Sequence, residues 1–240
     1  MNTTQKVIKT FAICLAALII LSIINGVAHL VTSAFSFNND VNISEAYSSN
    51  IKNINIDVGS TNMIIKKGDI LSIDADVSKE FKIKEEGNTL IIKEKNITIF
   101  GNKKSSHTTI TIPNDLNNLS IDIGAGKLEL SDITSNNFSL NQGAGKVVIT
   151  NLISNNTTID GGTGELHITS SKLQNLDLDL GAGKCYYNGI LLGNNKIDQG
   201  VGELILDLYR EDYTIKASKG LGSITINGES YSKDVTVGEG

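Results

Sequence analysis

The sequence predicts an all-β fold, a β-solenoid (single-stranded β-helix) with rungs of about 19 residues, preceded by one N-terminal transmembrane helix. Three observations lead to this prediction. Glycine pairs recur at an almost constant interval, apolar residues alternate with polar ones around each pair, and a long apolar run without charges precedes the repeats. The 240 residues are 40% hydrophobic and 20% charged, which is too apolar for a disordered chain, and two cysteines exclude a disulfide scaffold.

The N-terminal region has the pattern of a membrane anchor. No Asp, Glu, Lys or Arg occurs from Thr10 to Asn39, and residues 11–30 are mostly apolar. A helix of about 20 residues crosses a hydrocarbon core of about 30 Å. Lys6 and Lys9 precede the run, so we expect a cytoplasmic N-terminus and an extracytoplasmic remainder. The predicted location is the cell membrane, with a single crossing.

A cleaved signal peptide is the alternative to this anchor. The small residues Ala28 and Ala34 favour cleavage, but the end of the apolar run has no clear A-x-A site. The anchor is therefore the preferred interpretation, with a cytoplasmic stub and transmembrane helix at 1–32. Residues 33–50, rich in Ser and Asn, are expected to form a tether.

Pairs of glycines one residue apart define the repeat, at spacings of 19, 19, 19, 19 and 20 residues. Glycine permits positive φ and close backbone approach, so each pair predicts a sharp corner between two strands. The structural repeat glycines are Gly124, Gly126, Gly143, Gly145, Gly162, Gly164, Gly181, Gly183, Gly200, Gly202, Gly220 and Gly222.

Stacking the repeats by their first glycine produces columns of like residues. Four positions after it stand Leu128, Val147, Leu166, Cys185, Leu204 and Ile224. Six positions after it stand Leu130, Ile149, Ile168, Tyr187, Leu206 and Ile226. Alternating apolar and polar residues are typical of half-buried strands, and stacked rungs about 4.8 Å apart would bury these columns in one core. An antiparallel sandwich could also use this repeat length, but it would not need identical corners.

The regular repeats are expected to span 119–240, and 51–118 to form irregular first rungs that cap the stack. One position of the turn predicts a ladder of amides that hydrogen-bond from rung to rung, made of Asn137, Asn156, Asn175 and Asn194. This column lapses at Tyr213, where one residue is inserted. The last rung, near 231–240, is expected to have an unprotected edge unless something covers it.

Several motifs follow one another in a fixed order from Ile51 onward. They are the runs at 53–57, 67–69, 71–76, 81–83, 87–92 and 110–113, and then the D-x-G-x-G runs that begin at Asp122. This order resembles the bacterial "putative adhesin" family of β-strand-repeat, membrane-attached domains, and more distantly the C-terminal domain of membrane regulators of envelope stress responses. The resemblance implies a membrane-attached, extracytoplasmic β-repeat domain, and it supplies no catalytic residues.

Aspartates stand two positions before most of the first glycines. Like charges stacked at strand spacing repel unless they are solvated, paired or bridged by a cation, so a calcium ladder is one interpretation. Its candidate residues are Asp122, Asp160, Asp179 and Asp198. The preferred interpretation is a corner aspartate that hydrogen-bonds its own turn, because calcium-binding nonapeptides place the aspartate after the glycines. No other metal site and no cofactor is expected.

Two further sets of residues concern the surface, a charge ladder and a tyrosine patch. Directly after the second glycine stand Lys127, Lys146, Glu165, Lys184, Glu203 and Ser223, which predicts a solvent-exposed charge ladder. Candidates for a sugar-stacking patch are Tyr186, Tyr187, Tyr209 and Tyr213, although Tyr187 falls in an inward column.

Composition and motifs point away from catalysis and nucleic-acid binding. The net charge is −5 with a single arginine, no helix is expected after the glycine pairs, and His107 and His167 lack zinc spacing. We expect a non-enzymatic, membrane-anchored extracytoplasmic module for adhesion, envelope structure or interaction, with a cell-wall or envelope-protein partner. The alternative is a regulator of an envelope stress-sensing system that binds a sensor or a cell-wall ligand. The oligomeric state does not follow from the sequence.

Overall fold

The computed structural model describes residues 40–94, 106–209 and 213–238. The predicted stub and transmembrane helix at 1–32 lie outside them. Within the described residues all regular elements are strands, which confirms the all-β prediction, and no helix there is long and apolar enough to cross a membrane. The strands are β1 (Asp40–Ala46), β2 (Asn53–Lys67), β3 (Ser72–Ser78), β4 (Phe81–Glu86), β5 (Thr89–Glu94), β6 (Ser106–Ile112), β7 (Leu116–Ser131), β8 (Thr134–Thr150), β9 (Ile153–Gln174), β10 (Leu176–Leu208), β11 (Tyr213–Ile226), β12 (Glu229–Tyr231) and β13 (Val235–Val237).

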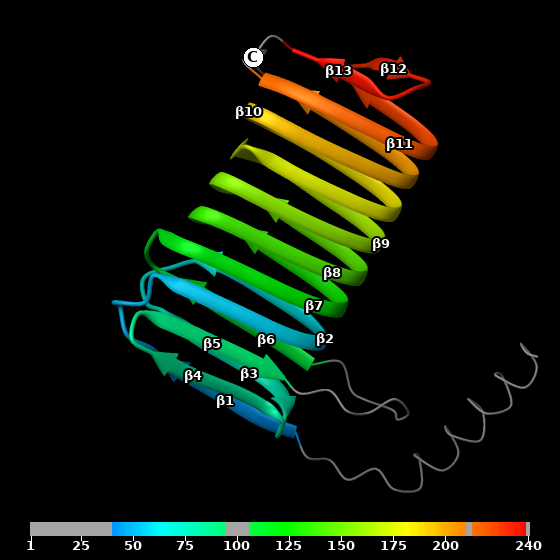
Figure 1. Cartoon of the computed structure of the whole chain (residues 1–240). Helices are drawn as coiled ribbons and strands as arrows, with labels where there is room; N and C mark the ends of the chain where they lie inside the picture. Colours follow the sequence, from blue (N-terminus) through cyan, green and yellow to red (C-terminus); the bar gives the residue numbers. More distant parts are fainter. Residues whose placement is uncertain (1–39, 95–105, 210–212, 239–240) are drawn as a thin grey trace, which may run out of the picture. The chain divides into compact units, whose positions relative to one another are not determined.

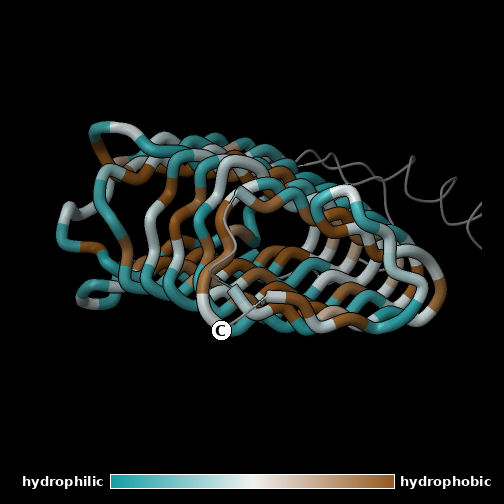
Figure 2. The backbone as a smooth tube through the Cα atoms, turned by 90° about the horizontal axis from the view of Figure 1, so that it is seen from above, coloured by the Kyte–Doolittle hydropathy of each residue, from teal (hydrophilic) through white to brown (hydrophobic). Residues whose placement is uncertain are grey.

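Strands β2 and β7 to β11 pair in parallel and stack as the rungs of a solenoid (Figure 1). Leu140 lies opposite Ile121 in the preceding rung, and Ile159 lies opposite Leu140, so the register follows the sequence repeat. Each long strand bends and continues, so one rung has two arms that face each other across the interior (Figure 2).

The predicted inward columns fill this interior. Val147, Ile149 and Ile168 have no exposed surface, and Cys185 and Tyr187 are only 1% exposed. Every member of both columns, from Leu128 to Ile226, belongs to one cluster of buried side chains. The alternation of apolar and polar residues therefore placed the core correctly, because successive side chains of a strand point to opposite faces.

Strand β2 is a regular first rung and not part of an irregular cap. Asp57 pairs with Asp122, and Thr61 pairs with Gly126, so Asp57-Val-Gly59 is an early copy of the corner motif. Strands β3 to β6 are inserted between β2 and β7. The spacing pattern missed this copy because Thr61 stands in place of the second glycine and because the insertion separates the copy from the later glycine pairs.

The inserted strands close the N-terminal end of the stack. Strands β5 and β6 each pair in parallel with one arm of β2, and then β4 and β3 pair antiparallel with them. Strand β1 pairs antiparallel with β3, with Val41 opposite Val77. Residues 40–46 lie within the predicted tether at 33–50, but they form this strand because Ile43 packs against the core.

The C-terminal end is also closed. Strands β12 and β13 fold back antiparallel on β11, with Tyr231 opposite Ile224 and Val235 opposite Ala217. The link 232–234 joins β12 to β13 next to the corner 218–223 of β11. The link has fewer residues than this corner, so it does not follow the corner residue by residue. Strands β12 and β13 therefore cover both arms of the last rung, whose edge was expected to be unprotected.

The single inserted residue falls between Tyr209 and Tyr213. The register places Tyr213 opposite Gly193 and Thr214 opposite Asn194. The asparagine column therefore ends at Thr214, and not at Tyr213 as the 19-residue count suggested.

Candidate functional site

The glycine corners hold neighbouring rungs in close backbone contact. Gly164 has a φ of 139°, and a Cβ atom on it would lie 1.9 Å from the carbonyl oxygen of Gly145. A Cβ atom on Gly162 would lie 2.3 Å from the carbonyl oxygen of Gly143. Any larger residue would separate the rungs, so the corner fixes the position of every outward side chain beside it.

The asparagines form a ladder on the outer face of the first arm. Asn137 donates to Oδ1 of Asn118 over 2.8 Å, and Asn156 donates to Oδ1 of Asn137 over 3.0 Å. Asn175 donates to Oδ1 of Asn156 over 3.4 Å, and the backbone N–H of Asn194 then donates to Asn175 over 3.4 Å. The ladder also extends below the predicted residues, because Asn118 donates to Oδ1 of Asn53 over 2.6 Å.

The aspartate column has no arrangement suited to calcium. Asn141 separates Asp122 from Asp160, and its amide lies 3.5 Å from Oδ2 of Asp122. Asp160 and Asp179 pair directly in the register. In the part of the chain that the structure describes, no group of three or more His, Cys, Asp or Glu residues could hold a metal ion.

The fourth calcium candidate, Asp198, has partners within the protein. Lys196 Nζ lies 2.5 Å from Asp198 Oδ2, and the Ser218 hydroxyl donates to Oδ1. These hydrogen bonds, chiefly the one from Lys196, lower the pKa of the Asp198 carboxyl. Its charge is therefore balanced without a cation.

Part of the expected charge ladder forms ion pairs. Lys146 Nζ lies 2.9 Å from Glu165 Oε2, and Lys184 Nζ lies 3.1 Å from Glu203 Oε2. The hydrogen bond from Lys146 lowers the pKa of Glu165. These two pairs balance the charges of four members of the ladder.

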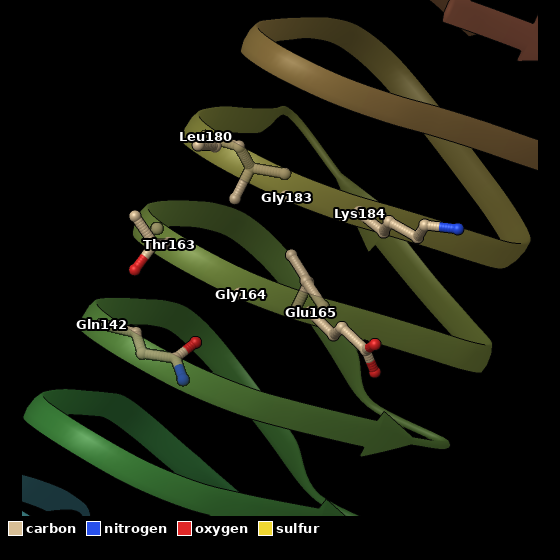
Figure 3. A pocket seen from close by; sticks show the side chains of 10 residues that line it. Gln142, Thr163, Gly164, Glu165, Leu180, Gly183 and Lys184 are labelled. Atoms are coloured by element: carbon tan, nitrogen blue, oxygen red, sulfur yellow. The ribbon is translucent and has the colours of Figure 1, made fainter. Parts of the chain in front are cut away.

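A small opening lies at the bend of the middle rungs, where Gln142, Thr163 and Leu180 come from successive turns of the chain (Figure 3). Gly161 has no side chain to fill its inward position, and Leu180 Cδ2 leans to within 2.4 Å of where a Cβ atom would be. The remaining cavity of about 20 Å³ has room for about one water molecule. It is a packing defect and not a ligand site.

A larger groove, of about 240 Å³, lies where β13 covers β10 and β11. Both of its carboxylates have partners within the protein. Asp198 is bound by Lys196 and Ser218, and Asp234 accepts the Lys219 N–H over 3.1 Å. This groove belongs to the C-terminal closure.

The outer face of the second arm carries a cluster that we call the tyrosine platform. It consists of His167, Tyr186, Asn188, Asp207 and Tyr209, from three consecutive rungs. The Tyr186 hydroxyl donates to Asp207 Oδ2 over 2.9 Å, and the Tyr209 hydroxyl bonds to Asn188 Oδ1. The rings of His167 and Tyr186 are 6.2 Å apart at 48°.

The tyrosine platform is exposed, yet its rings are held in place. Tyr209 is 60% exposed and Tyr186 is half-buried. The hydrogen bond to Asp207 raises the pKa of Tyr186, and the nearby Tyr209 adds to this effect. Two rings, a carboxylate and an amide are thus fixed on an open face, where they can contact a ligand without reordering.

Two of the four candidate tyrosines do not belong to the patch. Tyr187 is buried in its inward column, and its hydroxyl donates to the carbonyl oxygens of Ile190 and Ser171. Tyr213 is 5% exposed. His167, Asn188 and Asp207 were not associated with this patch in the sequence.

Cys185 is an interior residue. It is only 1% exposed, and burial raises the pKa of its thiol to about 12. A thiol of this kind is a poor nucleophile, because the thiolate is the reactive form.

Comparison with known proteins assigns the fold family. Residues 51–237 match the model of the family described as Toastrack DUF4097, and the chain belongs to this family. This confirms the resemblance found in the order of the motifs. No curated protein matches the chain.

Several solved structures of bacterial proteins match the chain. A "putative adhesin" from Bacteroides fragilis is 19% identical, with 78% of this chain and 97% of that chain covered and a TM-score of 0.49. A "putative cell adhesion protein" from Clostridium sporogenes is 13% identical, with 78% and 98% covered and a TM-score of 0.35. A "putative lipid binding protein" from Parabacteroides distasonis is 16% identical, with 79% and 97% covered and a TM-score of 0.36.

Proposed function

We propose that this member of the Toastrack family is a single-pass membrane protein that displays its β-solenoid outside the cytoplasmic membrane. It acts there as a non-enzymatic interaction module of the cell envelope, in adhesion or envelope structure. The observation that carries the proposal is that side chains on the outer faces of the solenoid are held in place by hydrogen bonds between rungs. The Asn137–Asn156 bond and the Tyr186–Asp207 bond both fix surface side chains in advance.

A surface of this kind favours binding over chemistry. Side chains that are already ordered lose little conformational entropy when a partner docks, so more of the contact energy appears as affinity. The glycine corners and the buried columns keep the rungs in one register, which makes the spacing of the surface groups constant.

The sequence leaves only a short link between the expected anchor and the solenoid. Seven residues, 33–39, separate the predicted transmembrane segment from strand β1. Even fully extended, they would span only about 25 Å.

Cysteine labelling tests the location. In a Cys14→Ser background, Ser139→Cys adds a thiol on an exposed strand position, and Asn2→Cys adds one to the expected cytoplasmic stub. A membrane-impermeant maleimide should label the first variant in intact cells and the second only after lysis. Labelling of Ser139→Cys only after lysis would overturn the proposal. Recovery of the chain in the medium and not in membranes would replace the anchor with a cleaved signal peptide.

The regulatory alternative predicts a defined partner. If the solenoid controls a stress-sensing system, the full chain cross-linked in membranes should retain a sensor kinase in near-stoichiometric amount. If it acts in adhesion or envelope structure, isolated envelope material should instead retain the full chain. The two measurements separate the candidate roles.

A further inference from the structure

We propose that the tyrosine platform binds an uncharged polysaccharide chain. This inference rests on the proposed function, because it names the ligand class of the envelope module. A sugar ring has C–H faces that pack on aromatic rings and hydroxyl groups that pair with polar side chains. Tyr186 and Tyr209 supply the rings, and Asp207 and Asn188 supply the polar groups.

The platform arises from side chains that lean diagonally across two rungs. Tyr186 leans forward to Asp207 in the next rung, and Tyr209 leans back to Asn188 in the previous one. Their hydroxyls are anchored in this way, while Tyr209 stays 60% exposed. Rings with a fixed orientation and a polar tip are effective binding anchors, because little rotamer freedom remains to be lost.

The polar groups of the platform keep capacity for a ligand. Asp207 uses one carboxylate oxygen for Tyr186, and Asn188 uses its amide oxygen for Tyr209. A second carboxylate oxygen can accept a sugar hydroxyl, and the Asn188 amide N–H groups can donate to one. His167, with its side chain 39% exposed, extends the aromatic surface to the preceding rung.

The charges around the platform favour a neutral ligand. Lys184 is paired with Glu203, and Lys146 is paired with Glu165, so neither lysine offers an uncompensated positive charge. Asp207 adds a negative charge beside the rings. An acidic polysaccharide would meet this carboxylate directly beside the rings, whereas an uncharged one would not be repelled by it.

Oligosaccharide binding by the full chain in detergent micelles tests the inference. The probes are cellohexaose and chitohexaose, which are uncharged, and hexagalacturonate, which is acidic; isothermal titration calorimetry measures the affinity. Either uncharged probe should bind. Tyr209→Ala and Tyr186→Ala should each weaken this binding about tenfold, which corresponds to about 1.4 kcal/mol.

Ile64→Ala is the matched control. Ile64 occupies the same outward column as Tyr186, is 41% exposed and lies in the first rung, so its removal should leave the affinity unchanged. Tyr209→Phe keeps the ring without its hydroxyl and should weaken binding less than Tyr209→Ala. Circular dichroism of each variant shows whether the fold is retained.

Three outcomes would overturn the inference. They are binding of hexagalacturonate alone, binding of no probe, and equal binding by the wild type and both alanine variants. The envelope proposal has its own readout, since retention of the chain on isolated envelope material does not depend on these probes. If no probe binds but the chain is still retained on envelope material, the ligand inference fails and the proposed function stands.

Discussion

The side-chain amide of Asn156 donates to Oδ1 of Asn137, 3.0 Å away in the preceding rung. The same asparagine accepts a hydrogen bond from Asn175, so it links three rungs at one point of the surface. The ladder adds side-chain hydrogen bonds in the direction in which the backbone already pairs, and it resists sliding of one rung against the next.

Asn156→Ala should lower the free energy of unfolding by about 1 kcal/mol, since two exposed hydrogen bonds are lost and their partners can turn to water. Chemical denaturation followed by circular dichroism measures this change. Ser139→Ala, on the same outer face, is the control and should have a much smaller effect. Equal effects of the two substitutions would mean that the ladder does not contribute to stability.

Gly164→Ala should be far more damaging than an ordinary loop substitution. Its φ is 139°, and the added Cβ atom would lie 1.9 Å from the Gly145 carbonyl oxygen, so the two rungs must separate. We expect a loss of more than about 4 kcal/mol, or failure to fold. Thermal unfolding measures the effect.

Gly87→Ala isolates the contribution of the backbone angle. Gly87 also has a positive φ, of 62°, but a Cβ atom there would have no neighbour within 4 Å. Its substitution should cost only about 1 kcal/mol. A cost for Gly164→Ala as small as this would mean that close rung contact is not what the corner glycines provide.

The repeat made the interior predictable but not the platform. The 19-residue period places Asn188 beside Asp207, and alternation decides which side chains point inward, so Cys185 and Tyr187 could be assigned to the core. The period does not determine which way a surface side chain leans. Tyr186 reaches a residue 21 positions ahead, and Tyr209 one 21 positions behind, so neither bond follows a column.

The ends of the solenoid were also hard to predict, for a related reason. A repeat describes residues that have a rung on both sides, and the terminal rungs do not. Strand β1 within the expected tether, and β12 and β13 over the last rung, cover edges that have no copy in the repeat. The first rung was recognisable only from Asp57-Val-Gly59, a single incomplete copy of the corner.

Cys185 should be unreactive in the folded protein. Burial raises the pKa of its thiol to about 12, so very little thiolate exists at pH 8. In a Cys14→Ser background, Ellman's reagent should not modify the folded chain at pH 8. It should modify the chain fully in strong denaturant, where the pKa returns to about 8.5. Rapid modification of the folded chain would contradict the buried position.

Asp198 should make stability depend on pH. The hydrogen bonds from Lys196 and Ser218 lower the pKa of its carboxyl in the folded state. This stabilisation is present above the unfolded pKa of about 3.9, and it is lost as the pH falls through the lower folded pKa. Asp198→Asn should therefore melt below the wild type at pH 6, and the gap should narrow progressively as the pH falls below about 3.9. Lys196→Met should show the same closing gap, and a gap that is constant with pH would exclude the carboxylate as its cause.

Lys219 and Asp234 protect the corner of the last rung. Strands β12 and β13 cover the arms, but the corner between them extends past the short link 232–234. The Asp234 carboxylate accepts the Lys219 N–H over 3.1 Å, and Lys219 Nζ donates to the Gly222 carbonyl oxygen over 2.8 Å. These charged groups occupy backbone positions that another strand would need, which is a known means of blocking edge pairing.

Removal of this protection should promote self-association at the C-terminal end. Leu221 is 73% exposed beside the corner, so an unblocked edge there would combine open backbone groups with an apolar side chain. The double variant Lys219→Ala/Asp234→Ala should form larger species than the wild type as protein concentration rises, measured by analytical ultracentrifugation in one detergent. Lys233→Ala, an exposed neighbour in the same link, is the control for the loss of one charge. Adding Leu221→Ser to the double variant should reverse the association, and association that persists in this triple variant would place the contact elsewhere on the solenoid.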